Sequence, residues 1–144
     1  MYLYGGMPPQ NDAPKKVLIV EDDAEIREEL AAVLRDLGYA VESVGNGRDA
    51  LDRLRWGLRP GVILLDLRMT VMTGWEFRAE QRKNAAIADI PVIAMTTGRW
   101  KPEDLRDFPE QIQKPLDLTK LQDLLDRYCE PRKYLERRRS SRRD

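Results

Sequence analysis

Short runs of branched apolar residues alternate along this chain with segments whose apolar residues recur every three or four positions. The runs VLIV (17–20), GVILL (61–65) and IPVIAM (90–95) are typical of strands buried on both faces of a parallel sheet. Between them, the spacing of the apolar residues predicts amphipathic helices. This alternation predicts an α/β fold with a parallel sheet, helices on both faces and right-handed crossovers.

The segment before the last predicted strand departs from this alternation. Residues 98–108 contain Pro102 and few apolar side chains, which leaves room for one short helix at most. We therefore expect the fourth helix of the alternation, which would lie between the fourth and fifth strands, to be short or distorted. Strands are predicted at about 16–20, 39–44, 61–65, 90–95 and 111–113, and helices at about 26–37, 46–57, 74–84 and 116–125.

The composition excludes several classes of function. The 144 residues include no histidine, which excludes His-ligated metal sites and Ser-His or Cys-His catalysis. The 25 basic and 25 acidic residues balance, which argues against a nucleic-acid-binding body. The single cysteine, Cys129, is compatible with a reducing cytoplasm, where we expect the chain to be located. No apolar run approaches the ~20 residues that span a bilayer, so no transmembrane segment is expected.

The two ends of the chain differ in composition from its centre. Residues 1–14 are rich in Gly, Pro and Asn and lack the features of a signal peptide, so a flexible leader is expected. Residues 15–130 are expected to form one domain. Residues 131–144 hold seven Lys or Arg against two acids. This basic tail is either a solubilising extension or a contact for nucleic acid, an acidic protein face or a membrane surface, and it is too short for a DNA-binding output domain.

Polar side chains that carry chemistry follow three of the predicted strands. Glu21 and Asp22 come directly after the first strand, Asp66 after the third and Thr96 after the fourth. Ligands bind beyond the carboxyl ends of strands in open α/β sheets, and the order 2-1-3-4-5 makes strands one and three neighbours. The acids should then meet in one crevice. Their repulsion, about 1 kcal/mol per pair at 4 Å in water, has to be offset by water, a helix N-terminus or a bound cation.

Four sequence fragments resemble one known family. IVEDDAEIREEL, VILLDLRMTVMTG, PVIAMTT and the later KP dipeptide, in this order, are similar to the receiver domain of bacterial two-component response regulators. The resemblance covers roughly residues 15–129. It implies a flavodoxin-like (βα)5 fold, in which a doubly wound parallel sheet of five strands has the order 2-1-3-4-5. It also implies that an aspartate accepts a phosphoryl group from a phosphohistidine on a sensor kinase.

The resemblance assigns the acidic residues to a magnesium and phosphorylation site. Asp66 matches the phosphoacceptor, and its carboxylate has to be ionised to act as a nucleophile. Glu21 and Asp22 match the acidic pair that holds Mg²⁺ together with Asp66 and the backbone carbonyl of Arg68. Oxygen donors of this kind suit a hard divalent cation. Such a cation would explain why the crowded acids are tolerated.

Two further residues match the family's site. Thr96 matches the hydroxyl that bonds the phosphoryl group, and Lys114 matches the basic residue that pairs with Asp66 or its phosphate. A cis peptide bond is expected before Pro115. Asp23 is expected to cap the first helix or to remain in water.

The region around the fifth strand departs from the family's pattern. Gln111 stands three residues before the lysine, where the family usually has an aromatic ring that reports phosphorylation to the output face. Only 17 residues separate Thr96 from Lys114. Trp100 and Phe108 in this region are either core side chains that replace the shortened helix or an exposed binding patch. Arg68 is expected to project beside the phosphorylation site.

The sequence therefore favours a receiver domain that accepts phosphate on Asp66 with Mg²⁺ and acts by binding other proteins. Its partners would be a sensor histidine kinase or phosphotransfer protein and an unknown downstream protein. It would not be an enzyme beyond its own phosphorylation and dephosphorylation. The alternative is a phosphorylation-independent docking module with an altered 98–113 surface. A phosphohydrolase of similar topology is disfavoured, because it would need an acid where Arg68 stands.

Overall fold

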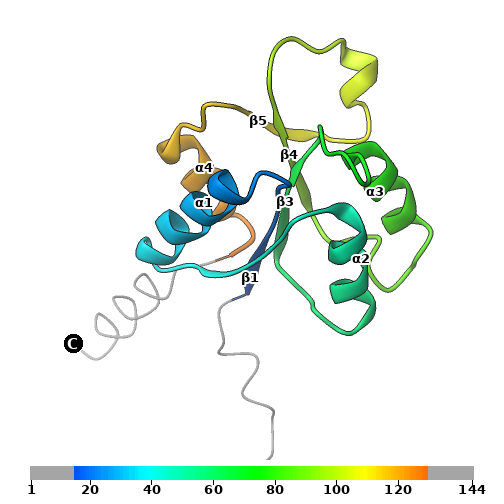
Figure 1. Cartoon of the computed structure of the whole chain (residues 1–144), viewed down its shortest axis with the longest axis horizontal. Coiled ribbons are helices and arrows are strands. Elements are labelled where there is room, and N and C mark those ends of the chain that lie inside the picture. Colours follow the sequence, from blue (N-terminus) through cyan, green and yellow to red (C-terminus); the bar gives the residue numbers. More distant parts are fainter. Residues whose placement is uncertain (1–14, 130–144) are drawn as a thin grey trace, which may run out of the picture.

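Five parallel strands form the centre of the molecule (Figure 1). The computed structural model describes residues 15–129. Its strands run in the order β2-β1-β3-β4-β5, which confirms the predicted topology. The predicted leader and the basic tail lie outside the described residues. The strands are β1 (Lys16–Val20), β2 (Ala40–Val44), β3 (Val62–Asp66), β4 (Val92–Thr96) and β5 (Glu110–Gln113).

Helices cover both faces of this sheet (Figure 1). They are α1 (Ala24–Asp36), α2 (Gly47–Arg55), α3 (Gly74–Arg82) and α4 (Leu118–Leu125). Alternate residues of a strand point to opposite faces, so β1 supplies Val17 and Ile19 to the core under α1 and α4. Its Leu18 and Val20 join the core under α2 and α3. This division explains why the strand is apolar without a break. Between residues 15 and 129, no helix is long and apolar enough to cross a membrane.

Polar residues at the ends of the strands start the helices. The carboxylate of Asp23 accepts a hydrogen bond of 3.1 Å from the amide of Ile26, so Asp23 caps α1 as predicted. Asn46 caps α2 in the same way. The helices begin and end within about two residues of the predicted bounds, because single capping residues decide where the first turn starts.

The helix expected between β4 and β5 is reduced to a single short turn. Pro102–Leu105 forms a 3₁₀ helix of four residues between β4 and β5, which confirms the predicted short or distorted element. Phe108 follows it and is fully buried in the core under α2 and α3. Phe108 is therefore the core side chain that fixes this segment to the sheet, one of the two roles considered for it.

Candidate functional site

The carboxyl ends of β1 and β3 bring three acids together. Oxygen atoms of Glu21, Asp22 and Asp66 all lie within 4.8 Å of one another. The cause is the strand register, because Val20 pairs with Leu65 and the residue after each of them in the chain is an acid. Glu21 and Asp66 are both buried. The structure thus contains the crevice that the strand order predicts.

Lys114 places a cation between the two buried acids. Its Nζ lies 2.6 Å from Glu21 Oε1 and 3.7 Å from Asp66 Oδ2. The lysine follows β5, and its amide donates a hydrogen bond of 2.7 Å to the carbonyl of Thr96. The bond to Pro115 is cis, as predicted. In this state Lys114 pairs more closely with Glu21 than with Asp66, a preference that the sequence does not indicate.

Both carboxylate oxygens of Glu21 already have partners. Oε1 accepts from Lys114, and Oε2 accepts a hydrogen bond of 3.2 Å from the amide of Asp23. The backbone carbonyl of Glu21 accepts a bond of 2.8 Å from Arg27. The sequence does not single out Arg27, because no motif marks a helix arginine that bonds back to the strand end before it. Asp22 is the acid of the cluster whose carboxylate has no hydrogen-bond or ion-pair partner among residues 15–129.

The loop after β3 folds back on Asp66. The amide of Arg68 donates to Asp66 Oδ1 at 3.2 Å. Helix α3 begins close behind, and a Cβ on Gly74 would lie 2.6 Å from Leu67 Cδ2 and 3.0 Å from the carbonyl oxygen of Asp66. Only glycine allows this approach without a shift of the backbone. The start of α3 therefore fixes the position of the Asp66 strand end.

The two buried acids have opposite pKa shifts. Burial raises the pKa of Asp66, and the hydrogen bond and negative charge of Glu21 raise it further, to about 6. Burial also acts to raise the pKa of Glu21, but the hydrogen bond from Lys114 and the other bonds to Glu21 outweigh it and leave that pKa lowered. Glu21 therefore remains ionised at a lower pH than Asp66. The carboxyl group of Asp66 loses its proton near pH 6.

Thr96 lies at the same edge of the sheet. It ends β4, and its neighbour Met95 pairs with Asp66 across β3 and β4. Thr96 is buried. The structure thus gathers Glu21, Asp22, Asp66, Thr96 and Lys114 at one end of the sheet.

The side chain of Arg68 takes a direction that the sequence does not show. Its guanidinium carbon lies 4.7 Å from the centre of the Trp100 ring. Trp100 in turn lies 5.2 Å from Trp75, between ring centres. The sequence predicts that this side chain projects beside Asp66, and in the structure its guanidinium lies over the Trp100 ring.

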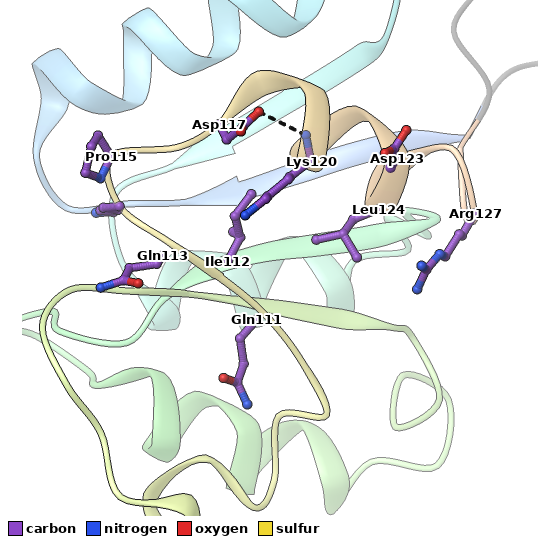
Figure 2. Close-up of a pocket in the computed structure, with 10 residues that line it drawn as sticks. Gln111, Ile112, Gln113, Pro115, Asp117, Lys120, Asp123, Leu124 and Arg127 are labelled. Atoms are coloured by element: carbon purple, nitrogen blue, oxygen red, sulfur yellow. Dashed lines mark hydrogen bonds between the residues drawn. The ribbon is translucent and has the colours of Figure 1, made fainter.

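A groove on the neighbouring edge contains the position where the family has its aromatic ring. It has a volume of about 610 Å³ and lies between β5 and α4 (Figure 2). Gln111 and Gln113 of β5 line it together with Lys120, Leu124 and Arg127. Gln111 is exposed, and its side-chain amide donates to the carbonyl of Phe108 at 2.9 Å. At this position an amide bonded to the backbone stands in place of an aromatic ring.

The donor set of the crevice suits a hard cation. Three carboxylates offer oxygen atoms only, which is the ligand type that Mg²⁺ prefers. Lys114 offsets part of the negative charge on Glu21 and Asp66, while no basic residue among those described forms an ion pair with Asp22. The residues present therefore fit a divalent metal ion at Asp22 and Asp66.

Comparison with known proteins agrees with this geometry. A family model described as "Response regulator receiver domain" matches residues 17–126. The two-component response regulator ORR11 of Oryza sativa subsp. indica is 31% identical over 118 residues, which span 76% of this chain and 79% of that protein.

Solved structures give the same result. The chemotaxis protein CheY4 of Vibrio cholerae has 32% identity and a TM-score of 0.72, and the match covers 81% of this chain and 99% of that one. The receiver domain of the sensor histidine kinase PA1611 of Pseudomonas aeruginosa has 30% identity and a TM-score of 0.72, over 81% and 98% of the two chains. That structure contains a magnesium ion coordinated in its active-site cleft. The fold is flavodoxin-like, and the chain belongs to the family of response regulator receiver domains, a signalling family.

Proposed function

We propose that this chain accepts a phosphoryl group on Asp66, with Mg²⁺ bound at the same site, in two-component phosphorelay signalling. The donor is a phosphohistidine on a sensor histidine kinase or phosphotransfer protein. The observation that carries the proposal is the buried cluster in which Lys114 joins Glu21 and Asp66 beside Asp22. The proposal includes a cytoplasmic location, with which the single cysteine is compatible.

Asp66 is the nucleophile of the transfer. One of its carboxylate oxygens attacks phosphorus, the phosphorus–nitrogen bond of the phosphohistidine breaks, and an aspartyl phosphate forms. The carboxylate has to be ionised first, and its pKa of about 6 leaves it mostly ionised at neutral pH. When bound, Mg²⁺ would neutralise the carboxylates and the phosphoryl oxygens together.

The other residues of the site would bind the metal ion and stabilise the phosphoryl group. Asp22, Asp66 and the backbone carbonyl of Arg68 would bind the metal ion, and Glu21 would act through a metal-bound water because both of its oxygens have partners. Lys114 already lies 3.7 Å from Asp66 and would turn from Glu21 to a phosphoryl oxygen. The hydroxyl of Thr96 would donate to another phosphoryl oxygen.

Phosphorylation by a small donor tests this function directly. The protein is incubated with phosphoramidate and Mg²⁺, and the adduct is measured by intact-mass spectrometry. We expect one phosphoryl group on the wild type, none on Asp66→Asn and an unchanged yield on Asp89→Asn, which alters an exposed acid away from the site. Removal of Mg²⁺ with EDTA should stop the reaction. An equal yield on Asp66→Asn would contradict the proposal.

A second function is favoured by one observation. The exposed Gln111 cannot perform the ring movement that the family uses, and the fourth helix is one 3₁₀ turn. Under this alternative, the surface of residues 98–113 binds a partner protein whether or not Asp66 is phosphorylated. Equal binding of a kinase-pathway partner to wild type and Asp66→Asn, with and without the phosphodonor, would favour it.

A further inference from the structure

Three side chains form a stack beside the candidate site, which we call the aromatic clasp: Arg68, Trp100 and Trp75. The guanidinium of Arg68 covers the Trp100 ring at 4.7 Å, and the two indole rings lie 5.2 Å apart with a tilt of 55°. Trp75 also meets Phe108 edge to face, with ring centres 6.5 Å apart. The clasp thus continues from the surface into the core.

The clasp joins the two loops that carry the site's residues. Arg68 stands two residues after Asp66, and Trp100 stands four residues after Thr96. Trp75 belongs to α3, and its indole N–H donates to the carbonyl of Asp104 at 2.7 Å. The segment that replaces the fourth helix is therefore tied at one end to a residue whose own amide bonds the carboxylate of Asp66.

Two polar groups of the clasp have no hydrogen-bond partner among the described residues. The indole N–H of Trp100 is buried and has no hydrogen-bond partner among residues 15–129. Over the same residues, the guanidinium of Arg68 forms neither an ion pair nor a hydrogen bond, so the Trp100 ring is its main contact. A buried donor without a partner costs free energy. When Trp100 moves toward water, its indole N–H gains a hydrogen bond. This gain offsets part of the free energy that is lost when Arg68 leaves the ring.

We propose that a phosphoryl group on Asp66 draws the Arg68 guanidinium away from Trp100, so that opening of the clasp reports phosphorylation in segment 98–108. This inference rests on the proposed function. A guanidinium forms paired, charge-assisted hydrogen bonds with phosphate oxygens, and these are stronger than its contact with the face of an aromatic ring. The receiver family's aromatic at position 111 is replaced by Gln111, so this chain needs another route from Asp66 to its surface.

Fluorine NMR of the three tryptophans observes the clasp directly. The protein is labelled with 5-fluorotryptophan, the resonances are assigned with single Trp→Phe variants, and Mg²⁺ with beryllofluoride is added as an analogue of the phosphoryl group. We expect the Trp100 resonance to shift most. Trp56 is 80% exposed on the far end of α2 and should not shift, so it is the internal control.

Two variants should change beryllofluoride affinity in opposite directions, which a purely structural role of the clasp would not do. Arg68→Met removes the guanidinium and should weaken beryllofluoride binding about fivefold or more, because one phosphate contact is lost. Trp100→Leu releases the same guanidinium and should tighten binding about two- to fivefold, because the clasp no longer has to open. Trp75→Phe keeps Arg68 on Trp100 and checks that loosening of the segment alone does not tighten binding. Trp100→Phe should fall between wild type and Trp100→Leu.

The outcomes separate this inference from the proposed function. If wild type binds beryllofluoride through Asp66 while the Trp100 resonance stays in place, the clasp is static and the inference is wrong. If Arg68→Met and Trp100→Leu both weaken binding, the clasp only supports the fold, and the inference is again wrong. If wild type and Asp66→Ala give identical spectra with beryllofluoride, the proposed function fails and the inference fails with it.

Discussion

The crevice at the ends of β1 and β3 and the segment between β4 and β5 differ in how tightly their residues are held. In the crevice, Glu21 and Asp66 are buried and share Lys114 within 4.0 Å. The segment instead has one 3₁₀ turn, a single fully buried side chain, Phe108, and an exposed Gln111. The residues proposed for phosphoryl chemistry are thus buried and paired. The segment that would report phosphorylation instead differs from the family's pattern, and we call residues 98–113 the rebuilt segment.

Phe108→Ala should give the largest effect and tests what holds the rebuilt segment. Removing this fully buried ring should lower the free energy of unfolding by about 3–5 kcal/mol. Urea unfolding measures the loss, with Gln111→Ala as the control in the same segment. Gln111 is exposed, so its loss should stay within about 1 kcal/mol. Similar losses in both variants would mean that the segment has no single anchor.

Lys114→Met should give the next largest effect and tests the crevice. It leaves Glu21 and Asp66 buried without their cation, so we expect a loss of about 2–4 kcal/mol at pH 7.5. The loss should shrink at pH 5, where Asp66 is already protonated. Lys83→Met removes an exposed ion pair and should change stability by less than about 0.5 kcal/mol. Glu21 stays ionised at pH 5, so a loss that is equal at both pH values would show that Lys114 acts through Glu21 and packing and that its contact with Asp66 adds no stability.

Asp66→Asn should stabilise the protein without Mg²⁺. The folded pKa of Asp66 is about 6 against an ordinary value of 3.8, so the folded state binds more protons between these values. The stability linked to Asp66 is complete below pH 3.8 and is lost as the pH rises through 6. The neutral amide avoids this loss, and we expect a gain of about 1–3 kcal/mol at pH 7.5. Lower stability of Asp66→Asn than of wild type in urea at pH 7.5 would contradict the raised pKa.

Asp22→Asn should have the smallest effect on stability and a clear effect on the metal ion. We expect Mg²⁺ affinity to fall by about tenfold or more, because the Asp22 carboxylate has no other partner within residues 15–129. Glu21→Gln should weaken Mg²⁺ less, since both oxygens of Glu21 already have partners. Calorimetric titration with Mg²⁺ measures both. A larger loss in Glu21→Gln would reverse the assignment of the direct ligand.

The sequence predicts what depends on local pattern and strand order. The apolar runs predict the strands, Asp23 and Asn46 predict two helix starts, and the strand order predicts that Glu21 and Asp66 meet. These follow from short-range chemistry and from the period of the side chains.

Contacts of long side chains were not predictable in the same way. Lys114 prefers Glu21 over Asp66, Arg27 bonds back to the carbonyl of Glu21, and Arg68 stacks on Trp100. Flexible charged side chains have several partners within reach, and the packed fold decides among them. No spacing in the sequence records that choice.

Backbone amide NMR with Mg²⁺ and beryllofluoride tests the central claim most directly. Wild type and Asp66→Ala are compared under the same conditions. The account predicts shifts in wild type alone, centred on Glu21, Asp22, Asp66 and Thr96 and extending into residues 98–108. The absence of any shift that depends on Asp66 would contradict it, and the chain would then be a docking module that does not use phosphorylation.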